Sequence, residues 1–233
     1  VKMKNIRKNP FNPSIIRFLL IIFISCSLGV PPYSAFALSI EEEEELGRKF
    51  LGNIKQQFEF IDDDFANEFI NDLGGYLIEN MEIRHFHFHF YIIRDNDLNA
   101  FAGPGGHIFI FTGLIELLRE IDEIAGVICH EIAHISLRHL SESIEKNKII
   151  GIATLAGILT GALVGGKAGG AIITGTTAAG IQKQLQYSRD DERQADQVGL
   201  GYMEKSGFDP HGFIEVLNKL QQSQMVSFNK IPA

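Results

Sequence analysis

Two histidines four residues apart form the segment of this sequence with the most evident chemistry, His130-Glu131-Ile132-Ala133-His134. On a helix, His130 and His134 lie one turn apart on the same face, so both imidazoles can reach one ion. Glu131 is rotated by about 100° from His130, which places its carboxylate beside that ion. The segment therefore predicts a zinc site in which Glu131 is the catalytic general base that takes a proton from water.

A catalytic zinc ion needs a third protein ligand, and a pair of acidic residues downstream could supply it. Glu192 and Asp196 are four residues apart and lie on one face of a predicted helix. We expect Glu192 to complete the site, with one zinc ion per chain, and Asp196 to accept the free N–H of a ligating histidine, His130. The alternative is a helix whose histidines pair with carboxylates and bind no metal, but the two motifs together favour zinc.

Two other groups of residues have simpler explanations. His85, His87 and His89 alternate with phenylalanines and could bind a metal. No carboxylate accompanies them, so we favour the polar face of a strand. Cys129 precedes the first ligand histidine, and we expect it to be a small buried helix residue.

The hydrophobic pattern predicts a chain that is mostly helical. Apolar residues recur with a helical period in most segments, and the period changes to two only in the first half of the chain. The glycines around Pro104 fit a tight hairpin. These features predict an α+β fold, mainly α-helical, with a small three-stranded sheet. The expected helices cover residues 39–51, 64–80, 122–142, 189–206 and 210–222, and the expected strands cover residues 85–93, 99–102 and 107–112.

Together, the motifs His130-Glu131-x-x-His134 and Glu192-x-x-Ala195-Asp196 resemble the zinc metalloendopeptidase family of HtpX and the CAAX prenyl endopeptidase, and in particular its exported BepA-type branch. The resemblance implies a gluzincin metallopeptidase domain whose active helices pack under the small sheet. It also implies an enzyme that hydrolyses peptide bonds of proteins or peptides in cell-envelope protein quality control. Other segments that follow the pattern of the branch are Asn99-Ala100-Phe101-Ala102, Pro104-Gly105-Gly106, Phe111-Thr112-Gly113-Leu114, Ser188-Arg189 and Ser206-Gly207-Phe208-Asp209-Pro210.

The resemblance also implies where substrate binds. It assigns Asn99, Ala100, Phe101 and Ala102 to an edge strand that binds the substrate backbone by strand addition. Members of the branch usually continue into a Ser/Thr-His-Pro stretch and a following arginine over the zinc. The sequence ends at Ala233 without a counterpart, so we expect that the C-terminal segment of the family is missing.

The first 37 residues have the composition of a targeting segment. Five basic residues and an apolar run at residues 18–24 precede Ala35-Phe36-Ala37, which fits a signal-peptidase site. We therefore expect a signal peptide at residues 1–37 and a metallopeptidase domain at residues 38–233. The protein would then be exported to the periplasm or another extracytoplasmic location. A lipoprotein signal ending at Cys26 and an uncleaved anchor are the alternatives.

A glycine-rich apolar stretch at residues 149–181 raises the question of a membrane span. Its first 18 residues, 149–166, carry no charge, which is the length of a short span. A single crossing would separate His134 from Glu192, and the remainder is too short for a second crossing. We therefore favour a helical hairpin that packs on the domain or dips into the bilayer surface, and expect association with a membrane surface.

Charge and motif content limit the other function classes. The net charge of −8 and the lack of a basic patch argue against a nucleic-acid partner. The main alternative to an endopeptidase is a zinc-bound chaperone or adaptor that holds envelope proteins without cleaving them. Glu131 favours the enzyme, because binding alone does not require a general base.

Overall fold

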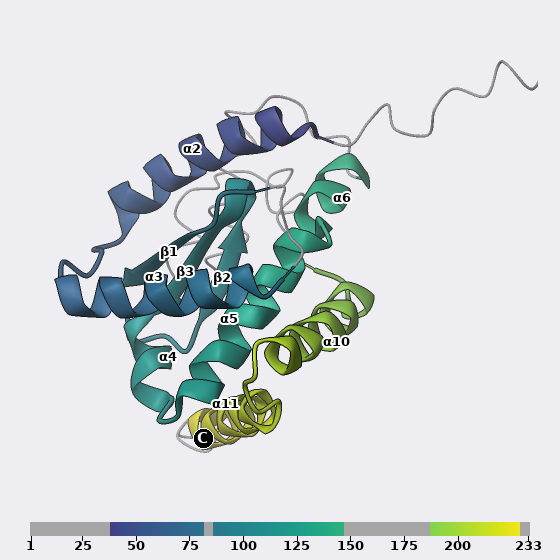
Figure 1. Ribbon diagram of the computed structural model, residues 1–233. Coiled ribbons are helices and arrows are strands. Elements are labelled where there is room, and N and C mark those ends of the chain that lie inside the picture. Colours follow the sequence, from purple (N-terminus) through teal and green to yellow (C-terminus); the bar gives the residue numbers. More distant parts are fainter. Residues whose placement is uncertain (1–37, 82–85, 147–186, 229–233) are drawn as a thin grey trace, which may run out of the picture. The chain divides into compact units, whose positions relative to one another are not determined.

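The computed structural model confirms an α+β fold that is mainly helical, with one small three-stranded sheet (Figure 1). It describes residues 38–81, 86–146 and 187–228. The expected signal peptide at residues 1–37 and the expected hairpin at residues 149–181 lie outside the described residues. Within the described part of the chain, no helix has both the length and the hydropathy needed to cross a bilayer.

The sheet contains one expected hairpin and one parallel pairing that was not predicted. β2 (Ala100–Gly103) and β3 (His107–Phe111) pair antiparallel through the 3-10 turn η1 (Pro104–Gly106). The two glycines of η1 have φ values of 73° and 82°, which residues with a side chain disfavour. β1 (His89–Ile93), shorter than the expected strand at residues 85–93, pairs in parallel with β3. The order β1-β3-β2 leaves β2 at an edge of the sheet.

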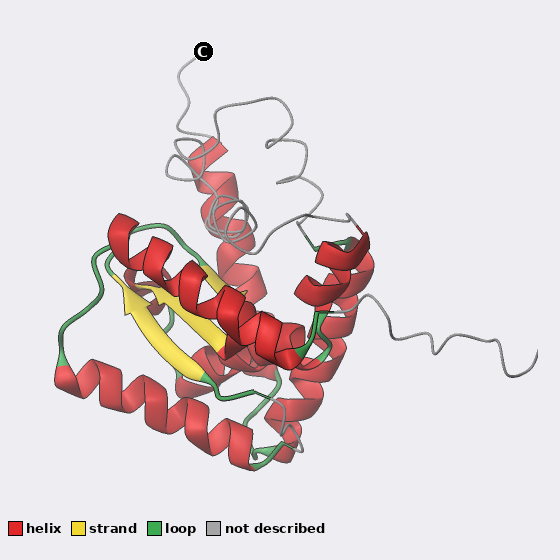
Figure 2. Cartoon of the chain, turned by 90° about the horizontal axis from the view of Figure 1, so that it is seen from above, coloured by secondary structure: helices red, strands yellow, loops and turns green. Residues whose placement is uncertain are grey.

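Each face of the sheet packs on different helices, because successive residues of a strand point to opposite faces. One face lies on α3 (Asp64–Glu79) and α5 (Ile121–Ser136), and the other lies on α2 (Ile40–Gln57). Figure 2 shows helices on both sides of the strands. The side chains packed with α3 and α5 are Phe90, Ile92, Ala102, Ile108 and Ile110, and those packed with α2 are Phe101, Phe109 and Phe111.

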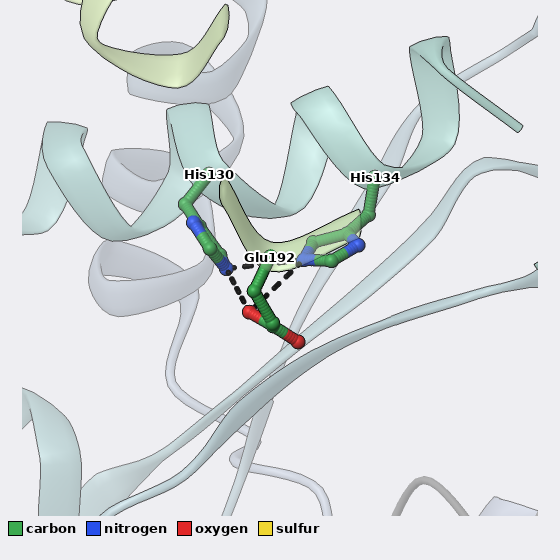
Figure 3. A group of neighbouring side chains, drawn as sticks. All are labelled: His130, His134 and Glu192. Carbon is green, nitrogen blue, oxygen red and sulfur yellow. Dashed lines mark hydrogen bonds and ion pairs between the residues drawn. The ribbon is translucent and has the colours of Figure 1, made fainter. Parts of the chain in front are cut away.

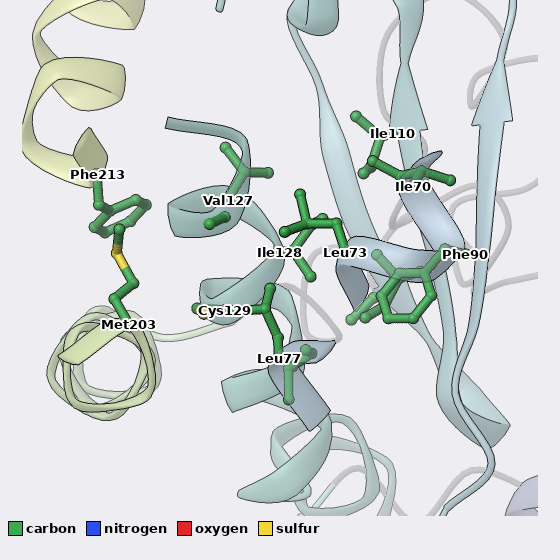
Figure 4. Packing of buried hydrophobic residues seen from close by; sticks show 14 of the residues in the cluster. Ile70, Leu73, Leu77, Phe90, Ile110, Val127, Ile128, Cys129, Met203 and Phe213 are labelled. Carbon is green, nitrogen blue, oxygen red and sulfur yellow. The ribbon is translucent and has the colours of Figure 1, made fainter. Parts of the chain in front are cut away.

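Helix α5 is surrounded by other elements on several sides. α10 (Arg189–Lys205) and α11 (His211–Phe228) pack on the side away from the sheet, where Met203 and Phe213 enter the core (Figure 4). Cys129 is fully buried in the same helix, which confirms its predicted structural role. The helix that carries both histidines is therefore held by the sheet and by the C-terminal helices together.

The expected helix at residues 122–142 is present but interrupted at residues 137–138, which was not predicted. α5 ends at Ser136, and α6 (His139–Lys146) begins after a sharp turn. Arg138 has a φ of 57°, a conformation that side chains rarely adopt. Its guanidinium bonds the buried carboxylate of Glu43 at 3.0 Å. This contact with α2 supports a turn that the local sequence, which lacks glycine and proline there, does not predict.

The other expected helices are present with shifted ends. Ser39 and Glu42 form the capping box at the start of α2, which runs on to Gln57 instead of ending at residue 51. A short helix, α4 (Thr112–Leu117), follows β3 and was not predicted. These differences lie at the ends of elements and leave the two candidate motifs on helices, as expected.

Candidate metal centre

His130 and His134 on α5 and Glu192 on α10 direct their side chains toward one point (Figure 3). Nε2 of His130 lies 3.1 Å from Nε2 of His134. Oε2 of Glu192 lies 3.5 Å from the first of these nitrogens and 3.7 Å from the second. The structure thus brings together the three predicted ligands. Among the described residues, no other three histidine, cysteine or acidic side chains converge in this way.

These separations fit a tetrahedral zinc site. Zinc–nitrogen bonds of about 2.0–2.1 Å place neighbouring ligand atoms of a tetrahedron roughly 3.3–3.4 Å apart. The observed distances of 3.1, 3.5 and 3.7 Å lie around this value. Two imidazoles and one carboxylate are also donors that zinc accepts, with a fourth position left for water or substrate. The donor set and its spacing therefore fit a catalytic zinc ion.

Glu192 reaches the histidines because α10 approaches α5 closely. Gly199 faces the backbone of His130, and a side-chain carbon there would lie 3.2 Å from its N and Cα atoms. Ser188 caps α10 by accepting from the backbone N–H of Asp191 at 3.2 Å. The cap and the close approach place the first turn of α10, which carries Glu192, over the histidine face of α5.

Asp196 lies at the other ring nitrogen of His130, as expected. Its Oδ1 is 3.1 Å from Nδ1, a hydrogen-bond distance, although the ring N–H does not point directly at an acceptor. A small rotation of the imidazole ring aligns the two atoms at this distance. Phe213 stacks on the same imidazole, with ring centroids 5.3 Å apart. Asp196 and Phe213 thus restrict the orientation of His130 from two sides.

Carboxylates dominate the electrostatics of the metal-free site. Burial lowers the pKa of His130, but hydrogen bonds with Asp196 and Glu192 outweigh it and raise the pKa to about 10. Hydrogen bonds from His130 and His134 lower the pKa of Glu192 to about 2. Without metal, a proton therefore stays on His130 at neutral pH, and a metal ion has to displace it.

A cavity of about 270 Å³ adjoins the candidate metal centre. Glu131 is only 7% exposed and lines this cavity together with His130 and Glu192. Its carboxylate therefore belongs to the same pocket as the predicted ligands without being one of the converging three. The apolar part of the lining includes Leu114, Val127, Phe213, Val216, Leu217 and Leu220.

The predicted substrate-binding strand borders the same cavity. Asn99 and Ala100 line it. The N–H of Phe111 donates to the carbonyl of Asn99 at 3.0 Å, so Asn99 and, by alternation, Phe101 direct their backbone groups toward β3. The N–H and C=O of Ala100 and Ala102 then point away from β3. Because Ala102 is buried and Ala100 only partly so, Ala100 presents the accessible backbone groups of this edge.

Two rings that enclose His134 were missed by the sequence analysis. The ring of Tyr187 stacks on His134 with centroids 4.0 Å apart. His139 lies edge-on, and its Nδ1 is 3.1 Å from Nδ1 of His134. Burial and the neighbouring His134 ring lower the pKa of His139. The spacing of five residues gave no signal, because on a continuous helix His139 would point away from the ligands.

The histidine-rich strand belongs to no such group. His87 and His89 are exposed, and the ring of His89 stacks on His107 with centroids 5.2 Å apart. Burial lowers the pKa of His107 to about 4, so this ring is neutral at physiological pH. His85 lies outside the described residues.

Comparison with known proteins agrees with this geometry. The sequence model described as peptidase family M48 matches residues 65–227. A beta-barrel assembly-enhancing protease of Yersinia pestis is 32% identical over 194 residues, covering 82% of this chain and 40% of the relative. The protein of that name from Escherichia coli K12 is 31% identical over 187 residues, covering 78% and 38%. Mitochondrial metalloendopeptidase OMA1 of Saccharomyces cerevisiae is 33% identical over 122 residues, covering 52% and 33%. The chain thus spans less than half the length of these relatives.

Proposed function

The chain belongs to peptidase family M48, and we propose that it is a zinc-dependent metalloendopeptidase that acts in cell-envelope protein quality control. The observation that carries this proposal is the convergence of two imidazole nitrogens and one carboxylate oxygen at distances suited to zinc. The names of the relatives support it, since each is called a protease or a metalloendopeptidase.

In this proposal, His130, His134 and Glu192 hold one zinc ion per chain. The ion, when bound, supplies Lewis acidity that polarises a peptide carbonyl and makes water more acidic. Glu131 takes the proton of the attacking water and passes it to the leaving amine. Its buried position in the cavity beside the ligands supports this role. Asp196 orients His130 through the outer ring nitrogen.

The proposed substrate is an extended segment of an unfolded protein. The outward N–H and C=O of Ala100 suit the addition of an extended chain to β2, and Asn99 and Phe101 hold that edge on β3 through their backbone groups, while the side chain of Ala102 packs in the core. The apolar wall of the cavity suits one apolar side chain beside the bond to be cleaved. Unfolded proteins expose both features, whereas folded proteins bury them.

The proposed location is outside the cytoplasm, in the periplasm and at a membrane surface. The signal-peptide pattern of residues 1–37 supports export. The name of two relatives, beta-barrel assembly-enhancing protease, is consistent with an envelope substrate. The net charge of −8 supports protein substrates over nucleic acid.

Replacing Glu131 with glutamine tests the proposed reaction. The amide has nearly the same shape as the carboxylate but cannot accept the proton, so casein cleavage should fall by about 10²–10⁴-fold. Zinc content, measured by plasma emission spectroscopy, should stay near one ion per chain. Glu116→Gln, at an exposed position outside the cavity, is the matched control and should cleave at the wild-type rate.

The outcomes separate the enzyme from its main alternative. Cleavage that disappears with Glu131→Gln supports the peptidase. If the zinc-loaded wild-type chain and the Glu131→Gln variant both fail to cleave and suppress casein aggregation equally, the chain is a zinc-bound chaperone or adaptor. A wild-type chain that binds no zinc contradicts the proposal at its first step.

A further inference from the structure

The two ring nitrogens of His134 face different surroundings. Nε2 faces the other predicted ligands, 3.1 Å from Nε2 of His130 and 3.7 Å from Oε2 of Glu192. Nδ1 faces away from them, 3.1 Å from Nδ1 of His139. His134 is 2% exposed and His139 is 3% exposed, so both rings are shielded from solvent.

Only one proton fits between two ring nitrogens at this distance, because two N–H groups would point at each other. A neutral imidazole that binds a cation through Nε2 carries its proton on Nδ1. The proton between the rings then belongs to His134, and Nδ1 of His139 has to accept it. We infer that His139 is a positioning residue of the metal centre, which accepts the Nδ1–H of His134 and holds Nε2 toward the metal. This inference rests on the proposed zinc site.

A sharp turn of the chain places His139 beside His134. On a continuous helix, a residue five positions after His134 would be rotated by about 140° from it. The break between α5 and α6 removes this rotation, with Arg138 at a φ of 57°. The turn is held by Glu43, which accepts from the Arg138 guanidinium at 3.0 Å and from the Ser141 hydroxyl at 2.6 Å.

Among the described residues, His139 is the hydrogen-bond partner of Nδ1 of His134. Tyr187 covers one face of the imidazole at a centroid distance of 4.0 Å, and the ring of His139 meets it nearly edge-on, at 75°. Nε2 of His139 is itself buried and has no hydrogen-bond partner among the described residues. Burial at this depth means that bulk water cannot readily replace His139 if its ring is removed.

Two variants of similar shape distinguish the loss of the hydrogen-bond acceptor at position 139 from a change in side-chain packing. In His139→Asn the side-chain oxygen can lie near the place of Nδ1 and accept the proton, whereas His139→Leu has a similar shape and no acceptor. The zinc affinity of the Leu variant should fall by about 10–100-fold, as for the loss of a partner of a ligating histidine. The Asn variant should stay within about threefold of wild type. Affinity is measured by competition with a chromophoric chelator, after circular dichroism has shown that each variant is folded.

Nitrogen NMR of the zinc-loaded wild-type chain gives a second readout that needs no variant. With ¹⁵N-labelled histidines, Nδ1 of His134 should be protonated, Nδ1 of His139 should not, and the two should be coupled across the hydrogen bond. A proton on Nδ1 of His139 overturns the inference, as does a Leu variant that binds zinc no more weakly than the Asn variant. A wild-type chain that binds no zinc overturns the inference together with the proposed function.

Discussion

At the scale of single residues, the two nitrogens of each imidazole have different partners, and the proposed site depends on which nitrogen faces which partner. His130 directs Nε2 to the ligand cluster and Nδ1 to Asp196, and His134 directs Nε2 to the same cluster. A histidine ligand has to be neutral, so protons and metal compete for the ring. This competition predicts that protons are released when a metal ion binds, and their number can be measured.

Zinc binding at pH 7 should release at least about one proton per chain. Hydrogen bonds with Asp196 and Glu192, opposed by burial, raise the pKa of His130 to about 10, so this ring is protonated before the metal binds. The apparent affinity should then rise by about tenfold per pH unit as pH increases toward that pKa. Calorimetry in buffers of different ionisation enthalpy counts the protons. Asp196→Asn removes one acceptor and should lower the pH at which the release of this proton ends, and a count of zero in wild type at pH 7 would contradict the assignment.

At the scale of elements, the site is a contact between two helices from distant parts of the chain. α5 carries His130 and His134, and α10 carries Glu192. The helices meet where Gly199 lies against the backbone of His130. Small changes in this contact should therefore affect the position of Glu192, the third proposed ligand, as well as the free energy of unfolding.

Two glycine-to-alanine changes on α10 test this contact. Alanine improves helix propensity at either position by about 1 kcal/mol. At Gly201 nothing lies within 4 Å of the new carbon, whereas at Gly199 it meets His130 backbone atoms at 3.2 Å. We expect the free energy of unfolding of Gly199→Ala to be lower than that of Gly201→Ala by about 1–3 kcal/mol, with weaker zinc binding. Denaturant titration measures this difference, and equal stabilities would show that the contact is not tight.

The edge of the sheet gives a prediction about substrate. Ala100→Pro removes an N–H that points away from β3, so the fold should tolerate it. A substrate that adds to this edge loses one hydrogen bond, which should lower kcat/KM by roughly two- to tenfold. Ala100→Ser keeps the N–H and serves as the control. If the proline and serine variants cleave a peptide equally fast, substrate does not pair with β2 at this residue.

At the scale of the described domain, α2 supports the turn next to the proposed metal centre without contributing a ligand to it. The guanidinium of Arg138, at the α5–α6 turn, bonds Glu43 and the carbonyl of Leu38, so the start of α2 is tied to the end of the histidine helix. Leu46 and Phe50 of α2 also pack with Leu140 and Ile144 of α6. We therefore expect α2, α5 and α6 to unfold together.

Glu43→Ala should lower the free energy of unfolding of the domain more than Glu41→Ala, a substitution on the same helix. Glu43 is 4% exposed, and its removal leaves the partly exposed Arg138 without its carboxylate and the Ser141 hydroxyl without its acceptor, which typically costs about 1–3 kcal/mol. Glu41→Ala, at an exposed position, should change the free energy of unfolding by less than about 1 kcal/mol. Urea titration compares the two, and similar midpoints would mean that the ion pair contributes little.

The sequence by itself determined the parts of the site that follow from helix geometry. A spacing of four places His130 with His134, and Glu192 with Asp196, on common faces, because the helical repeat is a local property of the backbone. The position of Glu131 beside the ligands follows from the same repeat. The hairpin at the glycine-rich turn was likewise predictable, since only certain residues tolerate its backbone angles.

Only the tertiary structure decided how these faces meet. The parallel pairing of β1 with β3 joins strands that are not adjacent in sequence, and no local pattern encodes it. The break before α6 depends on a bond between Arg138 and Glu43, 95 residues apart. That break is also what brings His139 to His134. Contacts between distant segments can outweigh the local preference for helix, and for this reason His139 could be recognised only after the chain was seen folded.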